Sequence, residues 1–284
     1  VFMAMGGNFI RATPDSAVTE DALRNTELTV QVSTKLNKSH LVHGRRALIL
    51  PALGRTDRDT QASGDQRVTV EDSMSAVHAS QGRLDPPGPE VRSEVAIVCE
   101  LAERLFAGEN APFRANAPQL DWIACRADYS LIRRRIENVI PGFEGFESKI
   151  KRGGGGFVLP NGPRDGRRFA TATGKARFTA NELDYPRVPE GRLILQTLRA
   201  HDQYNTTVYA KDDRYRGIYG GRRVVFVNEK DLAAAGFKDG DMVDMVSEYE
   251  DGVERRAESF RAVAYNTPVG CAAAYYPEAN VLVP

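Results

Sequence analysis

The chain has 284 residues, and its 38 Lys and Arg side chains balance its 38 Asp and Glu side chains. This length accommodates one large domain or two modest ones, and the zero formal net charge creates no field that favours nucleic acid. No apolar run approaches the roughly 20 residues that span a bilayer, so we expect neither a nucleic acid partner nor membrane insertion.

The first third of the chain, residues 1–110, is predicted to be an incomplete Rossmann-like α/β domain. The expected strands are residues 1–5, 28–32, 46–50 and 67–70, and the expected helices are residues 13–25 and 90–106. Strand, turn, helix and strand make a βαβ unit, whose glycine-rich turn binds phosphate in many proteins. The turn Gly6-Gly7-Asn8 lacks the full dinucleotide fingerprint, so a tight structural turn explains it as well as a ligand site does.

The middle of the chain, residues 111–190, is predicted to be a helical and Gly/Pro-rich connector. An amphipathic helix is expected at residues 128–140, where Pro141 and Gly142 end it. Residues 141–190 then show little periodicity and include four consecutive glycines at 153–156. We expect an extended connector there, because the spacing is not that of a phosphate-binding loop.

A long polar loop dominates residues 191–284. It lies between expected strands at 193–198 and 223–227, and it is rich in hydrogen-bonding side chains: Arg199, His201, Asp202, Gln203, Tyr204, Asn205, Thr206, Thr207, Tyr209, Arg214, Tyr215 and Arg216. Such a loop in a compact domain is usually functional or disordered, and aromatic and amide side chains between two strands argue against disorder. We therefore expect a surface that holds a large polar ligand.

The remaining elements predict a closed β-barrel. A short helix at 229–235 follows Asn228, and further strands are expected at 242–247, 256–265 and 271–276. The loop Arg199–Thr207 and the terminal segment Tyr275–Asn280 each follow a barrel strand. We therefore expect these two segments to lie side by side.

The metal-binding residue types are sparse. The three cysteines lie far apart, with no pair at the spacing of an iron–sulfur or structural zinc site, and they are Cys99, Cys125 and Cys271. No metal site is expected in this chain, and free thiols in a reducing, cytoplasmic compartment are the expected state. The sequence opens at Val1 directly into a strand, which we interpret as part of a longer protein.

Several motifs resemble the molybdopterin-dependent oxidoreductases of the dimethyl-sulfoxide-reductase superfamily. The loop HDQYNTT, the segment VNEKDLAAAGFKDGDMVDMVS and the ending GCAAAYYPEANVLVP resemble its last domain, which is a double-psi barrel. Met5–Phe9 (MGGNF) resembles its Gly-x-Asn turn, and Asn37–His40 (NKSH) stands where the family carries TETA. The resemblance covers essentially the whole chain, and the most similar branch is the formate-dehydrogenase-like alpha subunits.

This resemblance implies a bis(molybdopterin guanine dinucleotide) cofactor with molybdenum. Complete family members are more than twice as long, and their N-terminal part carries the molybdenum ligand and any iron–sulfur cysteines. We therefore expect the cofactor-binding C-terminal part of an oxidoreductase, without catalytic residues of its own and inactive in redox chemistry alone. Its expected partners are the N-terminal segment of the same enzyme and an electron-transfer subunit.

The expected cofactor contacts come from three parts of the chain. A diphosphate requires glycine-rich turns and cations, and a pterin edge suits amide, hydroxyl and backbone groups on a rigid loop. The full expected set is Gly6, Gly7, Asn8, Lys35, Asn37, Lys38, Ser39, Arg199, His201, Gln203, Tyr204, Asn205, Thr206, Tyr275, Glu278 and Asn280.

Two other functions fit parts of the sequence. A double-psi barrel also serves as a protein-recognition module without a cofactor, although such a module does not need the polar loop between its strands. A self-sufficient hydrolase needs a nucleophile, a base and an orienting group. Only His201 beside Asp202 hints at a hydrolase, and adjacent residues on a strand or loop rarely face each other.

Overall fold

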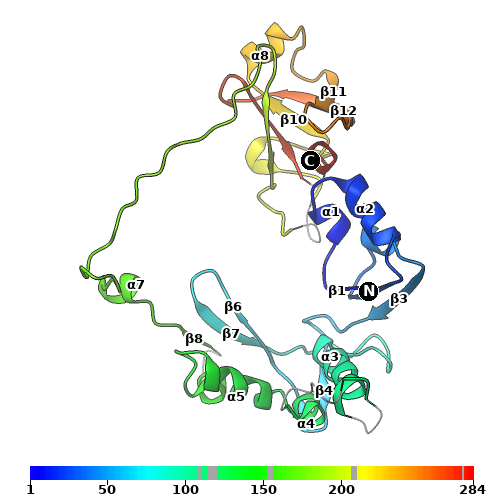
Figure 1. Cartoon of the computed structure of the whole chain (residues 1–284), viewed down its shortest axis with the longest axis vertical. Helices are drawn as coiled ribbons and strands as arrows, with labels where there is room; N and C mark the ends of the chain where they lie inside the picture. The colour runs from blue at the N-terminus through cyan, green and yellow to red at the C-terminus, as the bar shows by residue number, and fades with distance from the viewer. Residues whose placement is uncertain (108–110, 114–119, 152–155, 206–209, 277) are drawn as a thin grey trace. The chain divides into compact units, whose positions relative to one another are not determined.

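The computed structural model describes residues 1–107, 111–113, 120–151, 156–205, 210–276 and 278–284 (Figure 1). The chain divides into two compact units, of which the first joins Val1–Leu50 to Glu182–Pro284 and the second is Pro51–Asn181. The expected segments 1–110, 111–190 and 191–284 remain a prediction. Within the described ranges, none of the helices has the length and apolar character needed to cross a membrane.

The N-terminal part of the first unit is a three-stranded sheet with two helices. Its elements are β1 (Phe2–Met5), α1 (Phe9–Ala12), α2 (Ser16–Arg24), β2 (Leu28–Ser33) and β3 (Arg46–Pro51), and the strand order is β1-β2-β3. Strands β1 and β2 pair in parallel, with Phe2 opposite Thr29. The βαβ unit is therefore present, and its Rossmann-like character stays a prediction.

The helix expected from Thr13 to Asn25 is present as α2, and a separate short helix, α1, precedes it. Thr13 precedes Pro14 and takes an extended conformation, which ends α1 because the proline ring disfavours helical geometry in the residue before it. Asp15 then adopts a left-handed conformation (φ 44°), and its side chain accepts a hydrogen bond from the Val18 backbone at 3.5 Å. Asp15 therefore caps α2, two residues after the cap predicted at Thr13.

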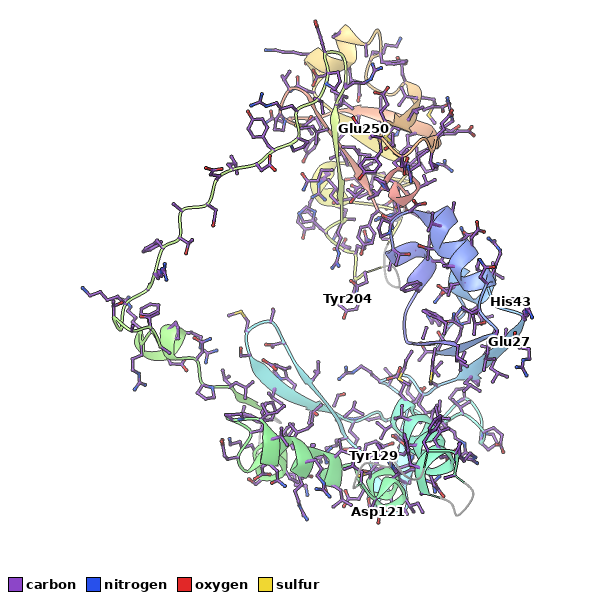
Figure 2. All side chains as sticks on the ribbon, viewed as in Figure 1. Glu27, His43, Asp121, Tyr129, Tyr204 and Glu250 are labelled. Atoms are coloured by element: carbon purple, nitrogen blue, oxygen red, sulfur yellow. The ribbon has the colours of Figure 1, made fainter. Side chains whose placement is uncertain are left out.

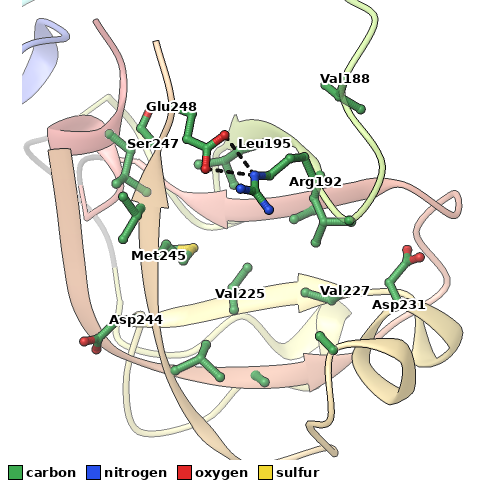
Figure 3. A pocket seen from close by; sticks show the side chains of 18 of the residues that line it. Val188, Arg192, Leu195, Val225, Val227, Asp231, Asp244, Met245, Ser247 and Glu248 are labelled. Carbon is green, nitrogen blue, oxygen red and sulfur yellow. Dashed lines mark hydrogen bonds and ion pairs between the residues drawn. The ribbon is translucent and has the colours of Figure 1, made fainter. Parts of the chain in front are cut away.

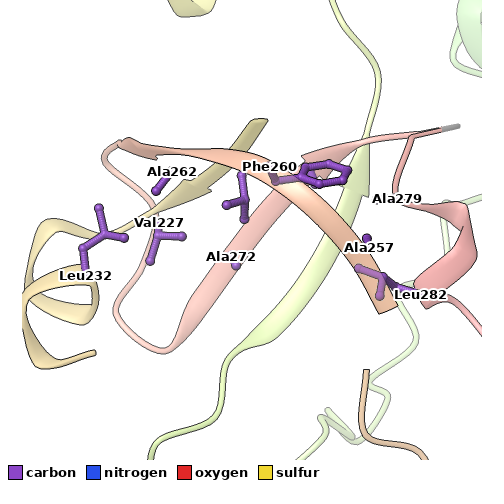
Figure 4. Packing of buried hydrophobic residues seen from close by; sticks show 10 residues of the cluster. Val227, Leu232, Ala257, Phe260, Ala262, Ala272, Ala279 and Leu282 are labelled. Carbon is purple, nitrogen blue, oxygen red and sulfur yellow. The ribbon is translucent and has the colours of Figure 1, made fainter. Parts of the chain in front are cut away.

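The C-terminal part of the first unit is a five-stranded sheet. Its elements are β9 (Ile194–Leu198), β10 (Val224–Val227), α8 (Glu229–Ala234), β11 (Met242–Ser247), β12 (Arg255–Ala264) and β13 (Cys271–Tyr275), in the order β11-β12-β10-β13-β9. The sequence predicted every one of these strands and the helix. A core that includes Val227, Leu232, Phe260 and Leu282 packs against this sheet (Figure 4).

The sheet is curled but open, whereas the sequence predicted a closed barrel. Among the described residues, β9 and β11 are the two edges and do not pair with each other. Closure requires a further ladder of hydrogen bonds between the edge strands. An apolar cavity of about 560 Å³ lies inside the curl instead, lined by residues such as Leu195, Val225 and Met245 (Figure 3). The double-psi topology stays a prediction.

The second unit contains the remaining elements. They are β4 (Thr60–Gln61), β5 (Gly64–Asp65), β6 (Val68–Glu71), β7 (Ala76–Ser80), α3 (Glu94–Ala102), α4 (Trp122–Ala127), α5 (Ser130–Val139), α6 (Phe146–Lys151), β8 (Gly156–Val158) and α7 (Gly162–Gly166). Strands β6, β7 and β8 form an antiparallel sheet. Helix α3 is shorter than the expected helix at 90–106, because Ser93 caps it and residues 103–107 form a π-helical turn.

The described residues 141–151 and 156–166 are folded, which corrects the extended connector expected from residue 141. Phe143, Phe146 and Phe157 pack edge to face with ring centroids 4.9–5.7 Å apart, and Val77 of β7 joins them in one core cluster. The short elements that carry these rings are too brief to show periodicity, so the sequence pattern missed them. The extended, exposed stretch begins after α7 and covers residues 167–190.

Candidate functional site

The polar loop and the terminal segment lie side by side, as expected. Strands β9 and β13 pair in parallel with Leu198 opposite Tyr275, so their carboxyl ends meet at one edge of the sheet. Beyond the strands, the Gln203 side chain donates a hydrogen bond to the Tyr276 carbonyl at 3.3 Å. The expected residues Thr206 and Thr207, and Tyr209 of the same loop, lie outside the described residues.

Gln203 holds the loop together from inside. Its side chain is 9% exposed, and its Oε1 accepts hydrogen bonds from the Ala200 backbone at 3.1 Å and from Arg222 at 2.7 Å. Its Nε2 donates to the Asn205 carbonyl at 2.6 Å. The structure therefore gives this expected ligand contact a full set of bonds within the protein.

Arg222 is a site residue that sequence reasoning missed. It is buried, its guanidinium lies 4.6 Å from the Tyr275 ring centroid, and it donates to the Tyr276 carbonyl at 3.1 Å and to Glu278 at 3.0 Å. Arg222 therefore ties the loop residue Gln203 to the terminal residue Glu278. The signal for it was an arginine two residues before the wholly buried strand β10.

Asp213 is a second buried anchor of the loop. Its carboxylate accepts hydrogen bonds from Arg216 at 2.6 Å, from the Tyr275 hydroxyl at 2.8 Å and from His201 Nδ1 at 3.2 Å. Burial raises the pKa of the Asp213 carboxyl, but the hydrogen bonds from Arg216 and Tyr275 outweigh burial and the pKa lies below its ordinary value. Tyr275 is 0% exposed, and burial together with Asp213 raises its pKa. The structure thus places Tyr275 in the core.

His201 pairs with Asp213 and not with its neighbour Asp202. Asp202 instead lies 3.6 Å from Arg214, and the His201 ring packs on Tyr215 at a centroid distance of 4.5 Å. Within the described part of the chain, no hydroxyl or thiol side chain is hydrogen-bonded to His201. The described residues therefore place no nucleophile beside His201 of the kind that the hydrolase hypothesis requires.

The solvent-facing groups of the loop are cationic, amide and aromatic. Arg199 donates to the Asn205 side chain at 2.8 Å and lies 5.7 Å from the Tyr276 ring centroid. Three tyrosine rings are exposed at 65–68%, and they are Tyr204 (labelled in Figure 2), Tyr215 and Tyr219. Flat aromatic faces beside hydrogen-bonding side chains suit a planar polar heterocycle.

The expected N-terminal residues also come together. The Asn37 side chain donates to the Gly7 carbonyl at 2.9 Å, and Ser39 Oγ lies 3.3 Å from Asn8 Oδ1. Gly6, which precedes this pair, has a φ of 69° that favours glycine and turns the chain out of β1. The structure therefore builds one polar corner from two segments that are 30 residues apart.

The expected lysines of this corner have different surroundings. Lys38 pairs with Glu20 at 2.6 Å, and the hydrogen bond from Lys38 lowers the pKa of that carboxyl despite burial. Lys35 is exposed, and only its carbonyl takes part in a described hydrogen bond, from Ser33 at 2.7 Å. Lys35 is thus the more accessible cation for an anionic ligand.

The N-terminal corner and the C-terminal sheet are joined within the first unit. The buried Asn280 side chain donates to the Arg11 carbonyl at 2.8 Å, and Arg255 pairs with Asp15 at 2.7 Å. Asn280, expected as a ligand contact, therefore links the two parts. One compact unit therefore contains the turn after β1 and the carboxyl ends of β9 and β13.

Comparison with known proteins identifies the C-terminal part. Residues 193–284 match the model of the molydopterin dinucleotide binding domain. The matched domain begins at β9 and contains the polar loop, Arg222, Asp213 and the terminal segment. The match confirms the resemblance to molybdopterin-dependent oxidoreductases that the sequence motifs indicate.

Relatives of known sequence cover the whole chain. It is 59% identical over 288 residues to a protein of Mycobacterium bovis named an uncharacterized oxidoreductase, and an equally similar protein occurs in Mycobacterium tuberculosis. It is 41% identical over 285 residues to the protein YdeP of Escherichia coli O6:H1. These alignments cover 98–100% of this chain but only 36% of each relative. The chain therefore spans about a third of the length of these relatives.

Proposed function

We propose that this chain binds a molybdopterin dinucleotide as part of a molybdenum-dependent oxidoreductase. The observation that carries the proposal is that the matched domain, residues 193–284, contains both the polar loop and the terminal segment beside it. The relatives named as oxidoreductases support the reaction class.

The finer assignment rests on the resemblance of the motifs. We propose a bis(molybdopterin guanine dinucleotide) cofactor, a formate-dehydrogenase-like branch and a double-psi barrel completed in the whole enzyme. The molybdenum ligand and any iron–sulfur cluster are proposed to lie in a further segment, with an electron-transfer subunit as a partner. The chain alone is proposed to be inactive in redox chemistry, and a cytoplasmic location remains a prediction.

The donor set fits this cofactor. A pterin is planar and polar at its edge, and exposed side chains such as Arg199, Asn205 and Tyr215 offer donors, acceptors and an aromatic face. When bound, the cofactor supplies the metal and its dithiolene ligands, and the protein binds and orients it. We propose that Gln203, Tyr275 and Asn280 position the contact residues, because their polar groups are buried and bonded within the protein.

Two arginines at opposite ends of β9 provide the test. Arg199 follows the strand at the proposed site, and Arg192 precedes it and pairs with Glu248 at 2.8 Å (Figure 3). In the complete protein, made in cells that produce the cofactor, Arg199→Gln is expected to reduce pterin and molybdenum content about tenfold. Arg192→Gln serves as the matched control and should leave both contents unchanged. Equal cofactor content in the two variants would refute this location.

The protein-recognition alternative has one observation in its favour. The exposed rings of Tyr204, Tyr215 and Tyr219 are of the kind that protein interfaces use as anchors. The same measurement separates the two functions. A complete protein that carries neither pterin nor molybdenum from a cofactor-producing cell would favour the recognition module.

A further inference from the structure

A polar cavity, separate from the apolar cavity inside the curled sheet, lies within the first unit between the turn after β1 and the C-terminal sheet. It has a volume of about 360 Å³, which is within the range of small-ligand sites. Its lining comes from four separate parts of the chain, and consists of Asn8, Arg11, Arg223, Arg256, Ala257, Glu258, Glu278 and Val281. Asn8 and Glu278 were expected as cofactor contacts, whereas the three arginines and Glu258 were not.

Two of the arginines lack a carboxylate partner within the part of the chain that the structure describes. Arg11 takes part in no ion pair there, and Arg223 donates only to the Glu258 carbonyl while its guanidinium lies 5.2 Å from the Phe260 ring centroid. Arg256, in contrast, pairs with Asp244 at 3.2 Å and with Glu254 at 3.4 Å. Arg11 and Arg223 are therefore the cations that can receive an anionic ligand.

The carboxylates of the cavity also differ. Glu278 is neutralised by the buried Arg222 at 3.0 Å, whereas Glu258 has no cation within ion-pair distance among the described residues. The cavity therefore combines two uncompensated guanidinium groups with one uncompensated carboxylate. A bare phosphate would be repelled by Glu258, but a ligand that carries both an anion and N–H donors satisfies all three groups.

A guanine nucleotide has this combination of groups. Its phosphates are anions that pair with arginine, and its base edge carries O6 and N7 as hydrogen-bond acceptors. Its N1–H and N2–H groups donate hydrogen bonds, which a carboxylate accepts. We propose that this cavity binds the guanosine phosphate end of the cofactor, with Arg11 and Arg223 on the phosphates and Glu258 on the base. This inference rests on the proposed function and adds the place and the residues that read the nucleotide.

The test uses the complete protein in its apo form, purified from cells that cannot make the cofactor, with GDP, CDP and pyrophosphate as calorimetric probes. Arg11→Gln and Arg223→Gln are each expected to weaken GDP and pyrophosphate binding at least about tenfold. Glu258→Gln is expected to weaken GDP binding about tenfold, whereas pyrophosphate binding should become tighter, because the variant removes a carboxylate that repels phosphate. Arg192→Gln, a distant arginine in the same unit, is the matched control.

Each outcome decides the proposal. Tighter binding of GDP than of CDP, lost in Glu258→Gln but retained in Arg192→Gln, supports it. Absence of GDP binding, equal binding of GDP and CDP, or full affinity in both arginine variants overturns it. Cofactor content in the holoenzyme is measured separately, so a protein that carries pterin but does not bind GDP refutes this cavity and leaves the proposed function standing.

Discussion

The hydroxyl of Tyr275, at the end of β13, donates a hydrogen bond of 2.8 Å to the carboxylate of Asp213, which lies 62 residues earlier in the chain. Both residues are buried, at 0% and 2% exposure. The same carboxylate also accepts a hydrogen bond from Arg216. A buried network of hydrogen bonds and an ion pair therefore links the polar loop to the core strand β13.

Removal of the charge at Asp213 is expected to destabilise the protein far more than removal of the Tyr275 hydroxyl. Asp213→Asn leaves Arg216 without its carboxylate and is expected to cost about 3 kcal/mol of unfolding free energy. Tyr275→Phe removes one hydrogen bond and is expected to cost about 1 kcal/mol. Urea denaturation of the two variants measures the difference. Equal losses would show that the ion pair contributes no more than a neutral hydrogen bond.

The stability that Asp213 contributes is expected to depend on pH. Because the folded-state pKa of its carboxyl is lowered, the contribution is fully present above the ordinary aspartate value of about 4 and is lost as pH falls through the folded-state pKa. The difference in unfolding free energy between wild type and Asp213→Asn should therefore be largest near neutral pH and shrink in acid. A difference that stays constant down to about pH 3 would contradict this assignment.

Variants at Gln203 and Asn205 are expected to distinguish effects on the stability of the fold from effects on ligand binding. Gln203→Ala leaves the Ala200 N–H and Arg222 without their acceptor and should cost about 1–3 kcal/mol of unfolding free energy. Asn205 is exposed at a φ of 47°, so Asn205→Gly keeps the backbone conformation and should cost less than about 0.5 kcal/mol. Pterin content should nevertheless fall in Asn205→Gly. Full pterin content in that variant would remove Asn205 from the site.

Limited proteolysis is expected to cut first within residues 167–190, where the chain is extended and exposed. The two fragments should remain associated, because Val1–Leu50 and Glu182–Pro284 form one compact unit joined by Arg255 and Asp15. Size-exclusion chromatography after cleavage measures this association. Arg255→Gln should weaken it, and fragments of the wild type that separate at once would contradict the unit described here.

The sequence by itself determined the local elements of the C-terminal sheet. Periodicity and turn chemistry predict the run Val224–Val227, the cap at Asn228, the helix stop before Gly236 and the strand Met242–Ser247. Each of these features is encoded within a few residues. The length and polarity of the loop after β9 also indicated the candidate site region, and the motifs indicated the resemblance to the family. These features depend only on neighbours in the chain.

Only the tertiary structure decided which polar side chains form hydrogen bonds within the protein and which are exposed to solvent. Gln203 and Glu278 are expected ligand contacts, and the structure shows that both also bond to Arg222. Asp15 meets Arg255 across 240 residues of sequence. Arg11 and Glu258 carried no local signal at all. Whether a polar group is hydrogen-bonded depends on all the atoms within about 3.5 Å of it. Long-range packing determines which atoms these are, and sequence periodicity does not encode that packing.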